Sequence, residues 1–330
     1  MTHQYHTVPE TSVQELKFFE LRKSQKATPS VTFLCVFTGQ EMLLEDSLNS
    51  IGDIAEEMGL EYEIMVVNTT LIPINPLSTE GVRPSNRLQI AHFTYFTAGE
   101  AKNEAIKACT GTHVVIFDPE KEYDINYADT ILQFVKQREI AIFYGEFLII
   151  VRDIIDSNGG WRPLSVAEDL DLLSRISETN KIMFYPTEGK ETINRFLTYK
   201  PSQIASKRSY RSLSFRKKLR IMEDLITGSN YRHGDIAYFW KGRFRLIGEL
   251  AYMRIKLSRK VKRDSGKSNF TIMMEALFES VILNEFEKYE IPGKPMRLYL
   301  EPDDIKYLQK KSDVFGKIKK TILGMFEKKD

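Results

Sequence analysis

From residue 31 onward, short apolar runs alternate with longer segments in which apolar residues recur at helical spacing. The apolar runs predict strands, most of them buried on both faces. They lie at 31–37 (VTFLCVF), 61–68 (EYEIMVVN), 88–92, 113–117 and 140–151. The helical spacing predicts helices at 44–58, 97–111, 125–137 and from 168 onward. Strands that alternate with helices of this length are joined by right-handed crossovers, so we expect an α/β fold with a largely parallel sheet.

Local signals mark several of the element ends. Gly59 stands where the C-terminal cap of the first helix belongs, and Thr97 with Glu100 fits a capping box at the start of another. Gly145 and Glu146 offer a point of division within the run 140–151. In parallel sheets ligands bind at the carboxyl ends of the strands. Residues expected at those ends are Thr38, Asn68 and Asp118.

The pattern changes after Pro186, where strand runs fade, helical spacing takes over and basic residues accumulate. A chain of 330 residues is long for one ordinary domain, so we place a boundary near Lys200. The predicted organisation is an N-terminal extension (1–30), an α/β domain (31–200) and a basic, mainly helical C-terminal region (201–330).

Charge supports this division. Apolar residues make up 42% of the chain and charged residues 28%, as in soluble globular proteins, and the net charge is +2. Between residues 201 and 267, however, 18 Lys/Arg stand against 5 Asp/Glu, a net +13 that leaves −11 for the rest. Nucleic-acid binding is disfavoured, because the chain as a whole is nearly neutral and no RNA-binding module is recognisable.

The cysteines and the apolar runs bear on localisation. Cys35 and Cys109 form no CxxC pair and have no histidine cluster around them, so we expect no disulfide or zinc site and a reducing, cytoplasmic compartment. No apolar segment typical of a secretory signal precedes residue 30. The run 140–151 contains Glu146 and is shorter than the ~20 residues that a membrane-spanning helix requires.

Two acidic constellations could carry chemistry. Asp118-Pro119-Glu120 follows a predicted strand, and two carboxylates in this arrangement suit Mg²⁺ or Mn²⁺ bound together with substrate phosphates. The alternative is that Asp118 caps the next helix. Further along, Glu168-Asp169 begins a helix, where an acid could take a proton from an incoming hydroxyl, and Asp169 is the better candidate because Glu168 also fits a capping box with Ser165.

Lys102 lies in the first turns of a predicted helix whose start should face the same strand ends. A cation there could meet a diphosphate. Taken alone, Lys102 would be read as a solvated lysine.

The order of these motifs resembles that of the family 2 glycosyltransferases, inverting enzymes of the GT-A fold that use nucleotide-diphosphate sugars. The segments that carry the resemblance are VFTGQE (36–41), Asn68, AKN (101–103), DPE (118–120) and GGW…EDLDL (159–172). The resemblance covers about residues 31–186, roughly half of the chain. The resemblance implies a mostly parallel, Rossmann-like sheet between helices and a metal-dependent transfer of a hexosyl group.

The resemblance also implies roles for individual residues. It implies donor binding by Thr38, Glu41, Asn68, Lys102, Asn103 and Asp118, and metal binding, of Mg²⁺ or Mn²⁺, by Asp118 and Glu120. It implies catalysis by Asp169 with Glu168, and places Gly159, Gly160 and Trp161 on the acceptor side.

This chain departs from the family pattern at several points. Glu120 replaces the second Asp of the metal motif, and Asn68 replaces an Asp that contacts the nucleotide base. The Q-x-x-R-W motif of processive synthases is missing, so transfer of a single sugar is expected.

The basic C-terminal region has two interpretations. Basic amphipathic helices with aromatic residues can lie on an anionic membrane. That would suit a protein on the inner face of a membrane whose acceptor is a lipid-linked glycan or a polyprenyl phosphate. Alternatively, these helices pack on the catalytic domain and expose a solvated basic face.

The sequence also allows two other functions. Because two motif positions are substituted, the chain could be a non-catalytic nucleotide-binding or scaffold protein of the same fold. A nucleotidyltransferase would need a glycine-rich, basic loop after the first strand, and Thr38-Gly39-Gln40 is a poor version of one.

Overall fold

A computed structural model describes fifteen stretches of the chain. They are residues 30–37, 39, 43–71, 74, 81, 86–94, 96–136, 142–144, 147–164, 168–180, 182–184, 215–228, 230–233, 243–258 and 268–282. Several predicted features lie outside these residues: Thr38, Glu41, Ser165, residues 1–29 of the N-terminal extension, and the boundary near Lys200.

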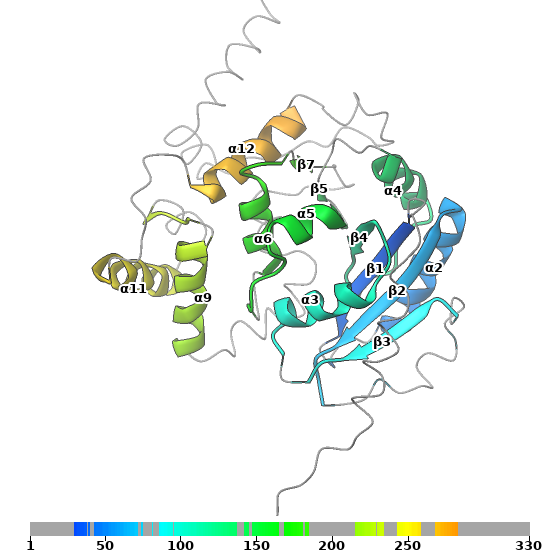
Figure 1. Ribbon diagram of the computed structural model, residues 1–330, viewed down its shortest axis with the longest axis horizontal. Helices are drawn as coiled ribbons and strands as arrows, with labels where there is room; N and C mark the ends of the chain where they lie inside the picture. The colour runs from blue at the N-terminus through cyan, green and yellow to red at the C-terminus, as the bar shows by residue number, and fades with distance from the viewer. Residues whose placement is uncertain are drawn as a thin grey trace, which may run out of the picture.

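The described strands form one seven-stranded sheet in the order β3-β2-β1-β4-β6-β5-β7 (Figure 1). They are β1 (Ser30–Phe37), β2 (Glu61–Asn68), β3 (Leu88–His92), β4 (His113–Ile116), β5 (Ile142–Tyr144), β6 (Leu148–Val151) and β7 (Ile182–Phe184). Strands β1 to β4 pair in parallel, as do β5 and β7, whereas β6 runs antiparallel to both of its neighbours. The largely parallel sheet and the division of the run 140–151 are therefore confirmed.

Helices cover both faces of the sheet, because successive strand residues point to opposite faces. Two helices, α2 (Leu44–Met58) and α4 (Tyr127–Lys136), share a core with Phe33, Ile64 and Val115. On the other face, α3 (Ala98–Ala108), α5 (Arg152–Ser157) and α6 (Glu168–Ile176) share a core with strand residues of opposite parity, such as Leu34 and Met65. The expected α/β fold, a mostly parallel sheet between helices, is confirmed.

The helix ends follow the local signals. Gly59 ends α2 in the left-handed conformation with φ 63°, which glycine adopts without steric cost. At the start of α3, the Thr97 side chain accepts from the Glu100 amide at 3.2 Å, and the Glu100 carboxylate accepts from the Thr97 amide at 2.9 Å. The predicted capping box is therefore present, and it fixes the start of α3, which follows β3 in the chain.

The structure contains elements that the pattern did not predict. Helix α5 has only six residues, and its N-cap, Val151, offers no side-chain cap. Strand β7 has three residues and pairs with β5. Both are too short to show a period, and their positions come from packing on the sheet.

Three described helices belong to the predicted C-terminal region: α9 (Phe215–Gly228), α11 (Arg243–Leu257) and α12 (Asn269–Ile282). Helix α12 packs on β7 and α6, while α9 lies between α6 and α11 (Figure 1). Leu225 and Phe270 enter the same core as Leu172. The described C-terminal helices are thus built onto the sheet, and none of the described helices is both long enough and apolar enough to cross a membrane.

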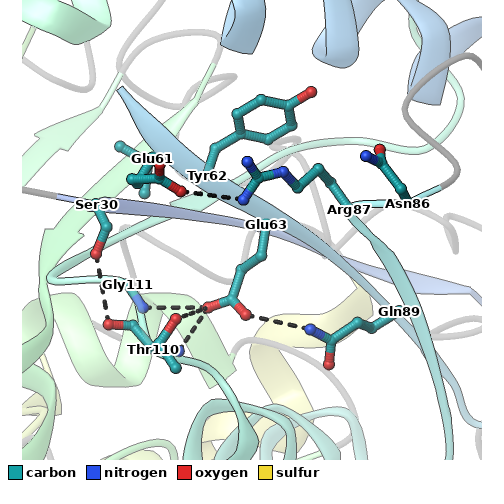
Figure 2. A pocket seen from close by; sticks show the side chains of 10 residues that line it. Ser30, Glu61, Tyr62, Glu63, Asn86, Arg87, Gln89, Thr110 and Gly111 are labelled. Carbon is teal, nitrogen blue, oxygen red and sulfur yellow. Dashed lines mark hydrogen bonds and ion pairs between the residues drawn. The ribbon is translucent and has the colours of Figure 1, made fainter. Parts of the chain in front are cut away.

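A polar pocket of about 340 Å³ opens at the amino ends of β1, β2 and β3 (Figure 2). Its central group is Glu63, whose Oε1 accepts from the Thr32 hydroxyl at 2.7 Å and from the amides of Thr110 and Gly111 at 2.5 and 3.1 Å. Gln89 donates to Oε2 at 3.3 Å. The carboxylate therefore holds the α3–β4 loop against the sheet, at the edge opposite to the strand ends where the site residues were predicted.

Candidate functional site

Asn68 and Asp118 lie at the carboxyl edge of the sheet, as predicted, Asn68 at the end of β2 and Asp118 just after β4, the two strands that flank β1. Asn68 is the last residue of β2 and is fully buried. Its Oδ1 accepts from the amide and the hydroxyl of Thr70, each at 2.8 Å, and its amide nitrogen lies 3.2 Å from His92 Nδ1. Asn68 thus shapes the turn after β2 and ties it to the end of β3.

Asp118 follows β4 and folds the DPE segment into a tight turn. Its Oδ1 accepts from the Glu120 amide at 3.0 Å, and the Tyr123 hydroxyl accepts from the Asp118 amide at 2.8 Å. Asp118 is half-buried and Glu120 is exposed. Since α4 begins only at Tyr127, the alternative in which Asp118 caps that helix is wrong.

The donor set of this turn fits a hard divalent cation. Within the described residues no group of three or more His, Cys, Asp and Glu side chains gathers at one point, so no closed protein cage is present there. Mg²⁺ and Mn²⁺ do not need one, because Mg²⁺ usually binds through one or two carboxylates plus substrate phosphates and water, and carboxylates also suit Mn²⁺. Asp118 and Glu120, just beyond the end of β4, offer two such carboxylates.

A second group of site residues forms a buried cluster of charges. Lys102, on the second turn of α3, places its Nζ 2.8 Å from Glu168 Oε1, and 2.7 and 2.8 Å from the two Asp169 oxygens. Lys102 is 0%, Glu168 1% and Asp169 2% exposed. The interpretation of Lys102 as a solvated lysine is therefore wrong, and its ammonium is held by the two predicted catalytic acids.

The cluster lies at the carboxyl edge of the sheet. The first turn of α3 begins beyond the end of β3, and there the Gly99 amide donates to the Leu164 carbonyl at 3.1 Å. An added Cβ on Gly99 would lie 2.0 Å from the Arg162 carbonyl oxygen, so a glycine is needed for this approach. The contact brings the segment before α6, and with it Glu168 and Asp169, to the start of α3.

Charge balance within the cluster distinguishes the two acids. Burial by itself lowers the pKa of Lys102, but Asp169 and Glu168 outweigh it and the pKa lies above its usual value. The pKa of Glu168 is raised because burial disfavours its charge, Lys102 compensates only in part, and Asp169 adds repulsion. Among the described residues, Glu168 Oε2 is buried with no hydrogen-bond partner and Lys102 donates to Oε1, whereas Asp169 accepts from both Lys102 and Trp161. The two acids therefore differ in their contacts: both Asp169 oxygens accept from Lys102, whereas burial and the neighbouring Asp169 raise the pKa of Glu168.

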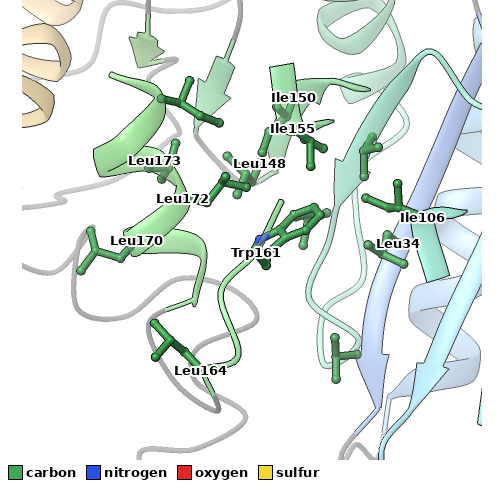
Figure 3. Close-up of a cluster of buried hydrophobic side chains, with 14 of the residues drawn as sticks. Leu34, Ile106, Leu148, Ile150, Ile155, Trp161, Leu164, Leu170, Leu172 and Leu173 are labelled. Atoms are coloured by element: carbon green, nitrogen blue, oxygen red, sulfur yellow. The ribbon is translucent and has the colours of Figure 1, made fainter. Parts of the chain in front are cut away.

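Trp161 supports Asp169 from the side of the sheet. Its Nε1 donates to Asp169 Oδ1 at 2.7 Å, and its ring lies 5.6 Å from Lys102 Nζ. The indole is 2% exposed and lies between Leu34 and Ile106 on one side and Leu172 on the other (Figure 3). Such packing leaves the ring one orientation, so the position of the Asp169 carboxylate follows from the core.

Asn103 and the glycine pair fix the turn that carries Trp161. The Asn103 side chain accepts from the Trp161 amide at 2.8 Å and donates to the Trp161 carbonyl at 2.5 Å. Gly159 and Gly160 have φ of 73° and 67°, in the region that side chains rarely adopt. The structure therefore unites six predicted residues in one group: Lys102, Asn103, Gly160, Trp161, Glu168 and Asp169.

Gly160→Ala should destabilise the protein more than Gly159→Ala. The left-handed backbone costs an alanine about 1–2 kcal/mol at either position. A Cβ at Gly160 would also lie 2.4 Å from Asn103 Oδ1, whereas one at Gly159 would meet nothing within 4 Å. Since Asn103 is held by two hydrogen bonds, we expect an additional loss of about 1–3 kcal/mol in the free energy of unfolding for Gly160→Ala. Urea titration of both variants measures this, and equal losses would contradict it.

Sequence reasoning missed a second ionic group behind the turn. Asp171 is fully buried and accepts from Arg162 Nη1 at 3.3 Å and from Arg175 Nε at 3.0 Å. Arg175 also donates to the Gly160 carbonyl at 2.7 Å, and Arg162 pairs with Asp224 of α9 at 3.7 Å. The i, i+4 spacing of Asp171 and Arg175 was a visible signal, but the role of the arginines as braces of the GGW turn depends on contacts distant in sequence.

The raised pKa of Glu168 makes a prediction about pH. A carboxyl group with a raised folded-state pKa binds its proton more tightly in the folded than in the unfolded state. The stabilisation that this tighter proton binding provides is complete below the unfolded-state pKa of about 4.3. It is lost as the pH rises through the pKa of the folded state. Glu168→Gln cannot titrate, so the variant should gain stability relative to wild type as pH rises from about 4.3. Urea titrations over a pH series measure this, and a difference that stays flat or falls would refute it.

Comparison with known proteins found similarity only among solved structures, since no protein-family model and no curated protein matches. One is the mannosyltransferase PcManGT from Pyrobaculum calidifontis in complex with GDP-Man and Mn²⁺, with 13% identity, 85% of this chain and 88% of that chain covered, and a TM-score of 0.48. Another is S. aureus TarS 1-349 in complex with UDP-GlcNAc, with 10% identity, coverage of 80% and 88%, and a TM-score of 0.46. A further S. aureus TarS structure has 13% identity, coverage of 77% and 49%, and a TM-score of 0.45. Similarity at this level assigns no activity to this chain.

Proposed function

We propose that this protein is a glycosyltransferase that moves one sugar from a nucleotide-diphosphate sugar to an acceptor hydroxyl with inversion of configuration. The observation that carries the proposal is the Asp169 carboxylate, fixed by Lys102 and Trp161 at the carboxyl edge of the sheet. The motif order shared with family 2 glycosyltransferases supports it, as does the DPE turn at the same edge. A buried ammonium beside a candidate base is typical of a site that keeps its base ionised.

The reaction needs a base on the acceptor side. The acceptor oxygen attacks the anomeric carbon as the bond to the diphosphate breaks, and Asp169 takes the hydroxyl proton. A single displacement from the opposite face inverts the configuration, with oxocarbenium character in the transition state by analogy with glycoside hydrolysis. Lys102 stabilises the ionised form of Asp169 before the attack. We therefore propose that Lys102 pairs with Asp169. The motif order had implied instead that Lys102 binds the diphosphate.

The donor side is assigned to the strand ends. Asp118 and Glu120 would hold Mg²⁺ or Mn²⁺, which neutralises negative charge on the departing diphosphate. We place the nucleotide near Asn68 and Asp118, with Thr38 and Glu41 as further donor contacts. Asn103 acts through the Trp161 turn that its side chain holds. We propose that the acceptor hydroxyl belongs to a lipid-linked molecule, because the basic region 201–267 includes α9, which packs on α6.

Calorimetric titration with UDP-, GDP- and dTDP-sugars, with and without Mn²⁺, tests the donor site. One donor should bind in the presence of Mn²⁺, and Asp118→Ala should weaken that binding by roughly tenfold or more, because a charged metal ligand is lost. Glu122→Ala, four residues further along an exposed segment, is the matched control and should bind like wild type. If no nucleotide sugar binds to the wild-type protein, the proposed function is wrong.

A further inference from the structure

Helix α11 exposes a row of large apolar side chains. Leu246, Leu250, Met253 and Leu257 are 66, 38, 51 and 84% exposed. Their spacing of four, three and four residues places them within a sector of about 60° around the helix axis. Isolated exposed leucines are common on protein surfaces, but four in one row form a continuous patch. We call this patch the α11 stripe.

Packing within the described residues does not account for the α11 stripe. The opposite side of the helix is also apolar and is already covered, since Ala251 and Ile255 are buried in the core. Helix α11 packs on α9 and lies on the far side of α9 from α6, at the edge of the described structure (Figure 1). Only one of the two apolar faces of α11 meets the part of the chain that the structure describes, so the other face is available to an apolar partner.

Positive charge borders the α11 stripe. Arg254 and Lys256 lie on either side of it and both are exposed, and Arg254 also pairs with Glu223 of α9 at 2.8 Å. The helix sequence holds four Lys/Arg and one Glu, and that Glu249 lies 2.7 Å from His233 Nε2. Leucine and methionine on one face with lysine and arginine beside it is the composition of helices that lie in the interface of an anionic bilayer, where the long basic side chains reach the headgroups.

We propose that the α11 stripe is a membrane-binding face that inserts into the headgroup region of an anionic bilayer. Charge complementarity selects this occupant over a second copy of the chain, because two stripes packed face to face would bring their basic borders together. Insertion would hold the sheet domain, through α9 and α6, at the membrane surface. The inference does not depend on the proposed function, because membrane binding can be measured without any donor or acceptor.

Sedimentation with vesicles tests the proposal on the full chain. The wild-type protein should bind vesicles of phosphatidylcholine and phosphatidylglycerol, and bind pure phosphatidylcholine more weakly. Leu246→Ser/Leu257→Ser should lower the association constant by roughly tenfold or more, because two leucines no longer leave water. The matched control is Leu71→Ser/Ile125→Ser, which removes two exposed apolar side chains elsewhere and should bind like wild type.

A charge variant tests the same face independently of its apolar contacts. Lys256→Gln should weaken binding to the anionic vesicles by about fivefold at low salt. Added salt should reduce the difference in affinity between the variant and the wild-type protein. Failure of the wild-type protein to bind anionic vesicles would overturn the proposal, as would unchanged binding by Leu246→Ser/Leu257→Ser. A wild-type dimer that this double variant converts to a monomer would identify the α11 stripe as a self-association surface and would also overturn it.

Discussion

Lys102→Met should lower the free energy of unfolding by about 3–5 kcal/mol, the cost of leaving a buried charge without its partner. The methionine keeps most of the length of the lysine stem, so the loss reports chiefly on the missing ammonium. Asp169, 2% exposed, would lose the ammonium that both of its oxygens contact. Urea titration monitored by circular dichroism measures the loss.

A matched control lies on the same helix. Lys107 is 67% exposed and forms an ion pair with Glu104 at 2.6 Å. Lys107→Met should cost about 0.5 kcal/mol or less, because exposed ion pairs contribute little. If Lys102→Met were no more destabilising than Lys107→Met, the two acids would not carry a buried negative charge, and the role proposed for Lys102 would be wrong.

Asp169→Asn should reduce turnover by about 10²–10⁴-fold, the usual effect of removing a positioned general base. Donor affinity should remain close to that of wild type, because the donor contacts are assigned to the strand ends. Release of nucleoside diphosphate from the donor, including its slow transfer to water, measures turnover without knowledge of the acceptor. Calorimetry on the same preparations measures affinity.

Glu168→Gln is the matched comparison for Asp169→Asn. It removes the neighbouring carboxylate but keeps the size of the side chain and an oxygen that can accept from Lys102. Turnover should therefore stay within a few-fold of wild type. Equal losses in the two variants would show that the acids share the role of base, and full turnover in Asp169→Asn would exclude Asp169 from it.

Much of the fold was readable from local pattern. The capping box at Thr97, the left-handed Gly59 and the apolar runs that became β1 and β2 are decided by residues within one turn or one strand. The placement of Asn68 and Asp118 at one edge followed from the parallel order of β2, β1 and β4. The antiparallel direction of β6 could not be predicted from the sequence pattern. A strand buried on both faces has the same apolar pattern in either direction.

The same distinction between local pattern and distant contacts applies to the candidate site. The sequence by itself determined which residue types stand at the strand ends and in the GGW and ED segments, since these follow from local order along the chain. Only the tertiary structure decided that Lys102 meets Glu168 and Asp169, 66 and 67 residues away, and that Trp161 and not solvent holds Asp169. The physical reason is that a lysine in a sequence is expected to be solvated, and only contacts with residues distant along the chain can show that it is buried. Burial between two carboxylates makes its charge part of the site.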